Sequence, residues 1–135
     1  MARKSHIPEA VLAAMKANDR HGWTLEDLQV ELARRGMPTD FSSIFRAAGR
    51  LTTEGSIRKL MLDDGRARFE LAGSHHDHLH CIRCDALVPT PCVIPPRVFA
   101  ILESRTGASI DDHSIIFSGT CRSCRQKRRR SRRRA

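Results

Sequence analysis

Two Cys-x-x-Cys pairs are the residues of this chain with the clearest capacity for chemistry. Cys81 and Cys84 form the first pair, Cys121 and Cys124 form the second, and residues 85–120 separate them. Each pair can direct two thiolate sulfurs at one ion about 2.3 Å away, and four such sulfurs meet the tetrahedral preference of zinc. The spacing predicts a structural zinc site, although a disulfide scaffold is an alternative for the same residues.

A histidine-rich run directly precedes the first cysteine pair. It consists of His75-His76-Asp77-His78-Leu79-His80. Imidazole nitrogens and a carboxylate make a harder and more open ligand set than four thiolates do, and such a set suits Zn, Fe(II) or Mn(II). The chain therefore predicts two kinds of metal site.

The length and composition are typical of small domains that a metal helps to stabilise. A chain of 135 residues forms one ordinary domain or two very small ones, and cores that small often need a metal or a partner. The five cysteines are an odd number, and the chain has neither an apolar leader nor an apolar run of about 18 residues. We therefore expect reduced thiols, a cytoplasmic location and no membrane partner.

The net charge of +9 is concentrated at one end of the chain. Residues 125–135 carry eight positive charges and no negative ones, so the preceding residues are nearly neutral. A block of like charges repels itself, which predicts a basic, disordered tail over 125–135. The tail could attract phosphates without sequence preference, or it could serve only to keep the chain in solution.

Three helices and a hairpin are predicted in the first half of the chain, from apolar residues at helical spacing, capping residues and a turn sequence. The expected bounds are 8–18, 25–36 and 40–54 for the helices and 56–62 and 66–71 for the strands. This order is typical of a winged helix-turn-helix domain that binds DNA. We expect such a domain over residues 1–72.

The third predicted helix has an apolar face and a polar face. The apolar face is expected to consist of Phe41, Ile44, Phe45, Ala48 and Leu51. The other face carries Ser43, Arg46 and Arg50, which suit phosphates and base edges, and Phe45 is expected to contact DNA with them. In the hairpin, the residues able to contact phosphates are Arg58, Lys59, Arg66 and Arg68. Amphipathic helices with two arginines also occur without DNA, so this helix alone leaves both interpretations open.

The second half predicts a small α/β dimerisation domain over residues 75–124. We expect a proline-rich edge segment over 88–96, a helix over 97–106 and a strand over 114–118. On the helix, the residues expected to face inward are Val98, Ile101 and Leu102. Exposed sheet edges and a thin core favour a homodimer, whose two-fold symmetry also matches a pseudo-palindromic double-stranded DNA operator.

From about residue 8 to residue 124, the chain resembles the ferric uptake regulator family. The resemblance is carried by Ser43-Ile44-Phe45-Arg46 where the family has Thr-Val-Tyr-Arg, by Phe69-Glu70-Leu71, by the run from His75 to Cys84, and by Asp112-His113-Ser114 with Gly119 to Cys124. It implies an α+β fold, in which a winged helix-turn-helix domain precedes a small α/β dimerisation domain with a structural zinc site. It also implies a dimeric, metal-responsive transcriptional repressor. Because Phe45 lacks the tyrosine hydroxyl, the operator is expected to differ from the AT-rich palindromes of the family.

The resemblance also implies a regulatory metal site between the two domains. Its matching ligands are Glu70, His76 and His78. Two further ligand positions of the family correspond to Gly22 and Pro89, which cannot bind a metal through a side chain. The candidate replacements are His21 and Cys92. Fewer oxygen ligands and an available thiolate favour Zn over Fe(II) or Mn(II) at this site, although a small buried apolar residue is the favoured interpretation of Cys92.

A second regulatory site of the family lies within the dimerisation domain. By resemblance it takes His75, Asp77 and His113, and the usual glutamate corresponds approximately to Pro96. The departures at both sites leave an alternative function open, namely a constitutive zinc-stapled protein that binds nucleic acid and has a vestigial sensing site.

An enzyme is the remaining alternative, because His-x-His motifs also occur in metallohydrolases that activate water. The chain has no Ser or Cys triad, no glycine-rich phosphate loop and no second cluster of carboxylates and histidines. We therefore expect no enzymatic activity and no small-molecule substrate.

Overall fold

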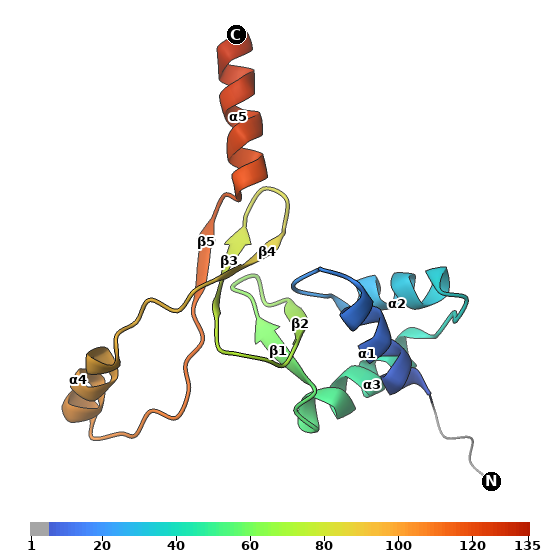
Figure 1. Ribbon diagram of the computed structural model, residues 1–135, viewed down its shortest axis with the longest axis horizontal. Coiled ribbons are helices and arrows are strands. Elements are labelled where there is room, and N and C mark those ends of the chain that lie inside the picture. Colours follow the sequence, from blue (N-terminus) through green and yellow to red (C-terminus); the bar gives the residue numbers. More distant parts are fainter. Residues whose placement is uncertain (1–5) are drawn as a thin grey trace. The chain divides into compact units, whose positions relative to one another are not determined.

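The computed structural model describes residues 6–135, and these residues divide into two compact units. The first unit ends at Ser74, and the second runs from His75 to Ala135. Three helices and a two-stranded sheet form unit 1, while a three-stranded sheet and two helices form unit 2 (Figure 1).

The helices of unit 1 begin where the sequence provides capping groups. Its helices are α1 (Ile7–Ala17), α2 (Leu25–Arg34) and α3 (Phe41–Thr53). Thr24 Oγ1 accepts a hydrogen bond from the Asp27 amide at 3.0 Å, and Asp27 Oδ2 accepts one from the Thr24 amide at 2.9 Å. This reciprocal capping box satisfies two amide groups that would otherwise lack partners at the start of α2. Asp40 caps α3 in a similar way, with Oδ2 accepting from the Ser43 amide at 2.9 Å.

A short hairpin follows the three helices and forms the wing. It pairs β1 (Ile57–Met61) with β2 (Ala67–Leu71) in antiparallel register, and its turn uses Gly65 at φ 80°, a conformation that glycine adopts without strain. Trp23 exchanges two backbone hydrogen bonds of 2.8 Å with Phe69. The segment before α2 is thereby attached to the edge of the wing.

The buried side of α3 differs from the expected apolar face. Ile44, Ala47, Ala48 and Leu51 are buried in the core of unit 1. The side chains of the two phenylalanines, Phe41 and Phe45, are instead 43% and 62% exposed. Phe41 and Phe45 therefore do not lie on the buried side of α3, in contrast to the apolar face that their spacing predicts. Ala47 lies three residues after Ile44 and four before Leu51, so it falls on the same side of the helix as both.

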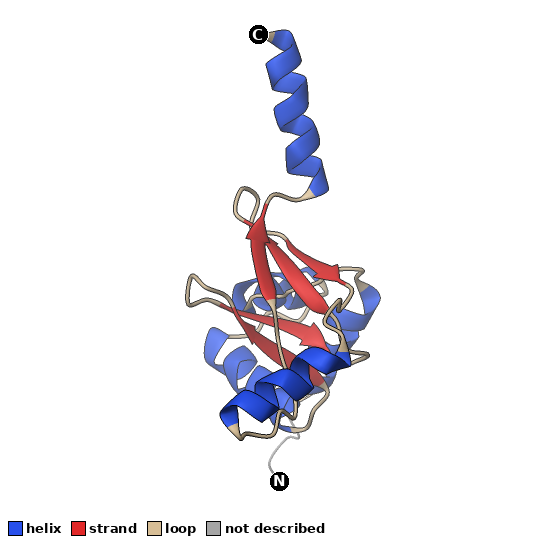
Figure 2. Ribbon diagram, turned by 90° about the vertical axis from the view of Figure 1, so that its left-hand side faces the viewer, coloured by secondary structure: helices blue, strands red, loops and turns tan. Residues whose placement is uncertain are grey.

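Unit 2 is built on a mixed sheet with the strand order β4-β3-β5, drawn in red in Figure 2. The central strand β3 (Asp77–Cys81) pairs antiparallel with β4 (Leu87–Thr90) and parallel with β5 (Ile116–Gly119). Pro89 has no amide hydrogen to donate, which is tolerated because β4 is an edge strand. Among the described residues of unit 2, the buried apolar side chains are those of Cys81 and Leu87, so its core is thin.

Helix α4 (Pro96–Thr106) contributes no buried residue to unit 2. Ile101 is 50% exposed and Leu102 is 45% exposed, and Val98 is not buried either. The expectation that these three residues face inward is wrong for the single chain. Long segments without regular structure connect α4 to β4 and β5, and the helix does not cover the sheet (Figure 1).

The last element, α5 (Arg122–Arg134), is a helix where the sequence predicts a disordered tail. Arginine, lysine and glutamine have unbranched side chains that lose little rotamer freedom in a helix. The helix begins directly after Cys121, so the cysteine cluster fixes its first turn and offsets part of the cost of helix nucleation.

Candidate metal centres and nucleic-acid interface

The four cysteines of the Cys-x-x-Cys pairs come together at one end of the sheet of unit 2. Their Sγ atoms all lie within 4.8 Å of one another. The Sγ atoms of Cys84 and Cys121 are 3.7 Å apart. Four Zn–S bonds of about 2.3 Å in a tetrahedron give an S–S separation of about 3.8 Å, so the cluster fits a structural zinc ion. All five cysteines of the chain are free thiols, which disfavours a disulfide scaffold.

The thiols of this cluster ionise unequally. The Cys121 amide, 3.3 Å from Cys81 Sγ, and then the Cys84 amide lower the pKa of Cys81 to about 6. The thiol of Cys121, followed by desolvation, raises the pKa of Cys124 to about 12. At Cys84 the Ala86 amide acts to lower the pKa, but the neighbouring thiols and desolvation outweigh it and the pKa is raised. Four adjacent thiolates therefore require a cation, and a divalent metal supplies one.

An aspartate pairs with a histidine beside the first cysteine knuckle, a pairing that sequence reasoning missed. His80 Nε2 lies 2.6 Å from Asp85 Oδ1. Asp85 has φ 64°, and its amide donates a 2.9 Å hydrogen bond to the Cys81 carbonyl. The pair thus stabilises the turn that carries Cys84. The available signal was an aspartate directly after the second cysteine, since Asp tolerates the left-handed conformation of tight turns.

A second cluster forms in unit 2 from the predicted ligands His75, Asp77 and His113. The Nε2 atoms of His75 and His113 are 3.0 Å apart. The Asp77 carboxylate oxygens lie 3.8 Å from His75 Nε2 and 3.7 Å from His113 Nε2. Two imidazoles and a carboxylate from three segments therefore converge, an arrangement that fits a divalent metal.

Cys92 lies in this second cluster. Its Sγ atom is 3.3 Å from His113 Nε2. The sequence hypothesis assigned Cys92 to the other regulatory site, so the structure differs from it on this point. The reason is the course of the chain: residues after β4 run beside the loop that precedes β5, where His113 lies.

The other candidate regulatory ligands form one pair in each unit. In unit 1, His21 Nδ1 lies 3.7 Å from Glu70 Oε2. In unit 2, the imidazole centroids of His76 and His78 are 4.6 Å apart, with an angle of 60° between the rings. Each pair by itself has a spacing that one metal ion can span.

The exposed face of α3 is the candidate surface for DNA. Ser43, Phe45, Arg46 and Arg50 are all exposed or half-exposed on this helix. Arg46 Nη2 donates to Ser43 Oγ at 3.2 Å, and Arg50 Nε donates to Glu54 at 2.8 Å. A pocket of about 250 Å³ lies beside the helix, lined by Ile7, Pro8, Ser43, Arg46, Ala47 and Arg50. The two guanidinium groups border a concave, basic surface.

The predicted phosphate contacts of the wing divide into exposed and buried residues. Lys59 and Arg66 are exposed, and Arg58 is half-exposed with Nη2 donating to the Gly73 carbonyl at 2.7 Å. Arg68 is only 2% exposed, so the expectation that it contacts phosphate is wrong. Arg68 lies in the middle of β2, where three consecutive residues are buried.

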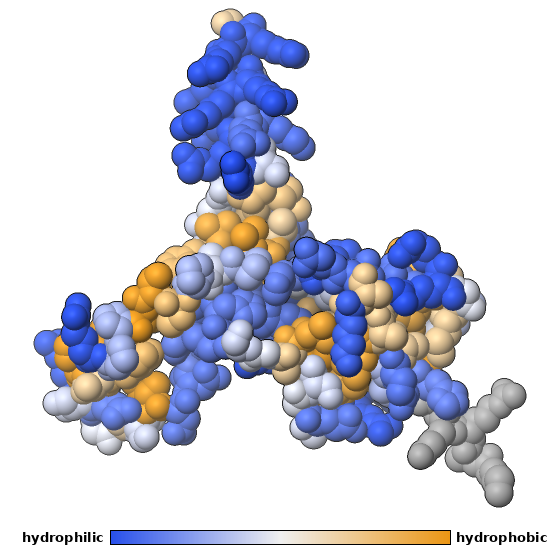
Figure 3. Space-filling view, in the orientation of Figure 1, coloured by the Kyte–Doolittle hydropathy of each residue, from blue (hydrophilic) through white to orange (hydrophobic). Residues whose placement is uncertain are grey.

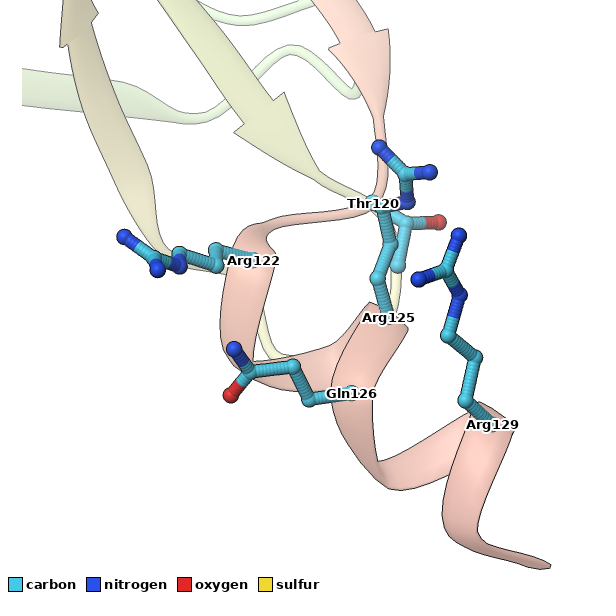
Figure 4. A pocket seen from close by; sticks show the side chains of 5 residues that line it. All are labelled: Thr120, Arg122, Arg125, Gln126 and Arg129. Atoms are coloured by element: carbon cyan, nitrogen blue, oxygen red, sulfur yellow. The ribbon is translucent and has the colours of Figure 1, made fainter. Parts of the chain in front are cut away.

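A second basic surface follows the first turns of α5. A pocket of about 400 Å³ is lined by Thr120, Arg122, Arg125, Gln126 and Arg129 (Figure 4). In the close-up, the Arg125 and Arg129 side chains extend to the same side of the helix as Thr120, whereas Arg122 points elsewhere. No acidic residue lines this pocket, so it suits an anion.

Comparison with known proteins decides the family. The family model described as "Ferric uptake regulator family" matches residues 2–117. The chain belongs to the ferric uptake regulator family. Members of this family are transcriptional regulators of metal homeostasis, and they are not enzymes. The recognition made from the sequence motifs is confirmed.

Individual relatives of the family are distant in sequence but similar in length and fold. The Ferric uptake regulation protein of Legionella pneumophila is 27% identical, over 84% of this chain and 85% of the relative. That of Bordetella parapertussis is 24% identical over 95% and 94%. The structure of the ferric uptake regulator from Francisella tularensis with iron has a TM-score of 0.75 and 26% identity, covering 91% of this chain and 94% of that one. The predicted α+β fold class with its winged helix is confirmed.

Among the described residues, no helix combines the length and apolar character that a membrane span requires.

Proposed function

We propose that the chain is a metal-dependent transcriptional repressor that binds double-stranded operator DNA as a homodimer and responds to zinc. The observation that carries the proposal is the presence, in one chain, of an exposed basic helix on a winged fold in unit 1 and of two clusters of metal-binding side chains in unit 2. A regulator whose DNA binding depends on metal availability uses both features.

DNA binding is assigned to α3 and the wing. A helix that follows a tight turn in a helix-turn-helix fits the major groove, where arginine can pair with guanine edges or with phosphates. Arg46 and Arg50 lie one turn apart on the exposed side, with Ser43 and Phe45 beside them. The wing adds Arg58, Lys59 and Arg66 for the phosphate backbone. The α3 residues thus supply sequence preference, and the wing residues supply sequence-independent affinity.

Dimerisation is assigned to unit 2 because it exposes an extensive apolar surface. Val93 is 75% exposed, Phe117 is 46% exposed, and Ile101 and Leu102 on α4 are about half exposed. Orange apolar atoms are visible over α4 in Figure 3. Monomeric proteins rarely leave such residues together in water, and a two-fold partner would bury them together with the sheet edge. The replacement Leu102→Glu should convert a dimer to a monomer in sedimentation, whereas Glu103→Gln on the same helix should not.

The regulatory metal is assigned to His21, Glu70, His76 and His78. Three imidazoles and one carboxylate provide four ligands, which is the number that zinc prefers and fewer than Mn(II) commonly takes. The family's two further ligand positions are occupied here by Gly22 and Pro89, and this favours zinc over iron or manganese. We infer that a metal bound by these residues, two from each unit, holds the two winged helices of a dimer at the angle that successive major grooves require.

The test of zinc-dependent DNA binding uses an operator sequence that the zinc-loaded protein selects from a pool of random DNA duplexes. Operator affinity is then measured at fixed ionic strength with zinc, Fe(II), Mn(II) or no added metal. Coupling of about 1 to 3 kcal/mol predicts that zinc raises affinity about 5- to 150-fold. The double variant His76→Ala, His78→Ala should lose this increase while it retains the zinc of the four cysteines.

A constitutive nucleic-acid-binding protein is the alternative that the same experiment separates. Equal operator affinity with and without metal, in protein that contains the structural zinc, would establish it and exclude the repressor. A larger increase with Fe(II) than with zinc would retain the repressor and overturn the assignment to zinc.

A further inference from the structure

We propose that Cys92 is a metal ligand, and that with His75, Asp77 and His113 it forms a thiolate-containing site selective for zinc and other thiophilic divalent metals. This inference rests on the proposed function, because it describes a second metal site of the same regulator. It transfers Cys92 from the regulatory site, for which the sequence offers it as a candidate, to the site of His113, and it thereby gives that site a thiolate ligand that the resemblance does not assign.

The measured separations are close to those of a four-coordinate metal site. Zn–N bonds of about 2.0 Å and a Zn–S bond of about 2.3 Å in a tetrahedron put N–N pairs about 3.3 Å apart and N–S pairs about 3.6 Å apart. His75 and His113 have a 3.0 Å N–N separation, and His113 and Cys92 have a 3.3 Å N–S separation. The Asp77 oxygens complete the group at 3.7 and 3.8 Å from the two nitrogens. The four donor atoms all lie within 4.8 Å of one another, which is compact enough for one four-coordinate metal ion.

Hydrogen bonds alone account poorly for this convergence. The Nε2 atom of His113 is within hydrogen-bond distance of both His75 Nε2 and Cys92 Sγ. An imidazole nitrogen carries either one proton or one lone pair, so it can satisfy only one such neighbour well. A shared metal satisfies all four donors at once, because each offers it a lone pair.

The carboxylate of Asp77 is oriented by a backbone amide that is not itself a ligand of the site. Asp77 is 2% exposed, and its Oδ1 accepts a hydrogen bond from the Ile115 amide at 3.1 Å. A buried carboxylate is costly unless a cation or several hydrogen bonds compensate its charge. The Ile115 amide fixes the orientation of the carboxylate, as outer partners of metal ligands commonly do, and leaves Oδ2 directed to His113. The ring of Phe99 lies 5.0 Å from the His113 ring and forms an apolar border.

The thiolate sets the selectivity of the site. With two neutral imidazoles, the carboxylate and thiolate charges neutralise a divalent ion. Thiolate is a soft donor that favours zinc and similar metals, whereas the carboxylate that the family places here is a hard donor that also suits Mn(II) and Fe(II). Replacing one anion by the other keeps the charge of the site and changes its preference.

Cobalt(II) absorption tests the proposal directly, because a thiolate bound to Co(II) produces a near-ultraviolet charge-transfer band that imidazole and carboxylate ligands do not. The full chain is first loaded with one zinc per chain at the four cysteines, and Co(II) is then titrated. We expect the band in the wild type and in the His76→Ala, His78→Ala variant, and its loss in Cys92→Ser and in His113→Ala. Loss of a residue that only orients a metal ligand typically lowers metal affinity ~10- to 100-fold. Because Cys92→Ser removes a ligand itself, the zinc affinity of this site should fall by at least that factor.

The variant Cys92→Asp keeps the negative charge and removes only the softness of the ligand. We expect it to bind zinc more weakly relative to Mn(II) than the wild type does. No band in the wild type at saturating Co(II), or a band that persists in Cys92→Ser, would overturn the proposal. Circular dichroism and a zinc content of one per chain show that each variant is folded. Operator binding is measured separately, so a failed repressor model and a failed Cys92 ligand give different results.

Discussion

At the scale of single residues, the exposure of a side chain shows a role that its residue type alone does not. Phe45 belongs to the apolar set by type, yet it is 62% exposed on α3 beside Arg46. An exposed phenylalanine next to arginine can contact the thymine methyl group or the sugar edge while the guanidinium pairs with a base or phosphate. Its exposure is therefore consistent with the proposed DNA surface.

Replacement of Arg46 by alanine is expected to weaken operator binding and to relax sequence preference. The loss of one base contact typically costs about 1 to 3 kcal/mol, which corresponds to about 5- to 150-fold in affinity. Fluorescence anisotropy with the selected operator and a scrambled duplex measures both effects. Lys16→Ala removes the same unit of charge from an exposed position on α1 and serves as the control. Equal losses of operator affinity in the two variants would show that Arg46 contributes only its positive charge and makes no specific base contact.

At the scale of elements, α2 ends in a group of charged side chains centred on Glu31. Its carboxylate accepts hydrogen bonds from Arg34 at 2.7 and 2.9 Å, from Arg35 at 2.8 Å and from Asn18 at 3.3 Å. Arg34 and then Arg35 lower the pKa of Glu31 to about 2 from an ordinary value of 4.5. The group joins the end of α2 to the end of α1 and thereby helps position the turn before α3.

Glu31 is expected to make the stability of unit 1 depend on pH in the acidic range. Because its pKa is lowered in the folded state, its stabilisation is fully present above about 4.5 and is lost as pH falls through about 2. Urea unfolding monitored by Trp23 fluorescence should show Glu31→Gln to be less stable than the wild type at pH 7. The two proteins should converge near pH 2. Glu26→Gln on α2 is the control, and a difference between Glu31→Gln and wild type that does not change with pH would contradict the assignment.

At the scale of the whole molecule, the two units differ in what stabilises them. Unit 1 has a cluster of twelve buried apolar residues, which includes Trp23. The described part of unit 2 buries only Cys81 and Leu87 among its apolar side chains. A small sheet with so little apolar burial is expected to depend on a structural metal and on a partner subunit for its stability.

Removal of zinc with a strong chelator is expected to unfold unit 2 and to leave unit 1 folded. Amide hydrogen exchange should increase over 77–81 and 116–119, while Trp23 fluorescence should remain that of the folded protein. Cys124→Ser should produce the same pattern without chelator, because it removes one of the four ligands. Retained protection of β3 in metal-free protein would show that the sheet is stable without the zinc.

Deletion of residues 125–135 is expected to reduce the salt dependence of DNA binding more than its sequence preference. The deletion removes eight positive charges and keeps Cys124. Each phosphate contact that is lost lowers the slope of log affinity against log salt by about 0.9. A chain with glutamine at the eight basic positions keeps the length and serves as the matched control. An unchanged slope in both variants would leave α5 without a role in DNA binding.

The local patterns of the sequence were sufficient to predict most elements and the ligand types. Cys-x-x-Cys spacing depends on a four-residue turn, and helices α1 to α3 follow from capping residues and apolar periodicity, all of which act within a few residues of chain. The motif His75–Cys84 was specific enough to recognise the family. These properties need no knowledge of distant segments.

The tertiary structure alone decided which distant residues meet. Cys92 lies in a loop without periodicity, and its neighbour His113 is 21 residues away, so only the paths of two loops determine their contact. The buried side of α3 includes Ala47 and not the larger phenylalanines, because the position of the neighbouring elements, and not side-chain size, selects the buried face. The apolar side of α4 stays exposed because its burial requires a surface that the single chain does not provide. Local interactions are encoded by neighbouring residues, whereas site composition and interfaces depend on packing between segments far apart in sequence.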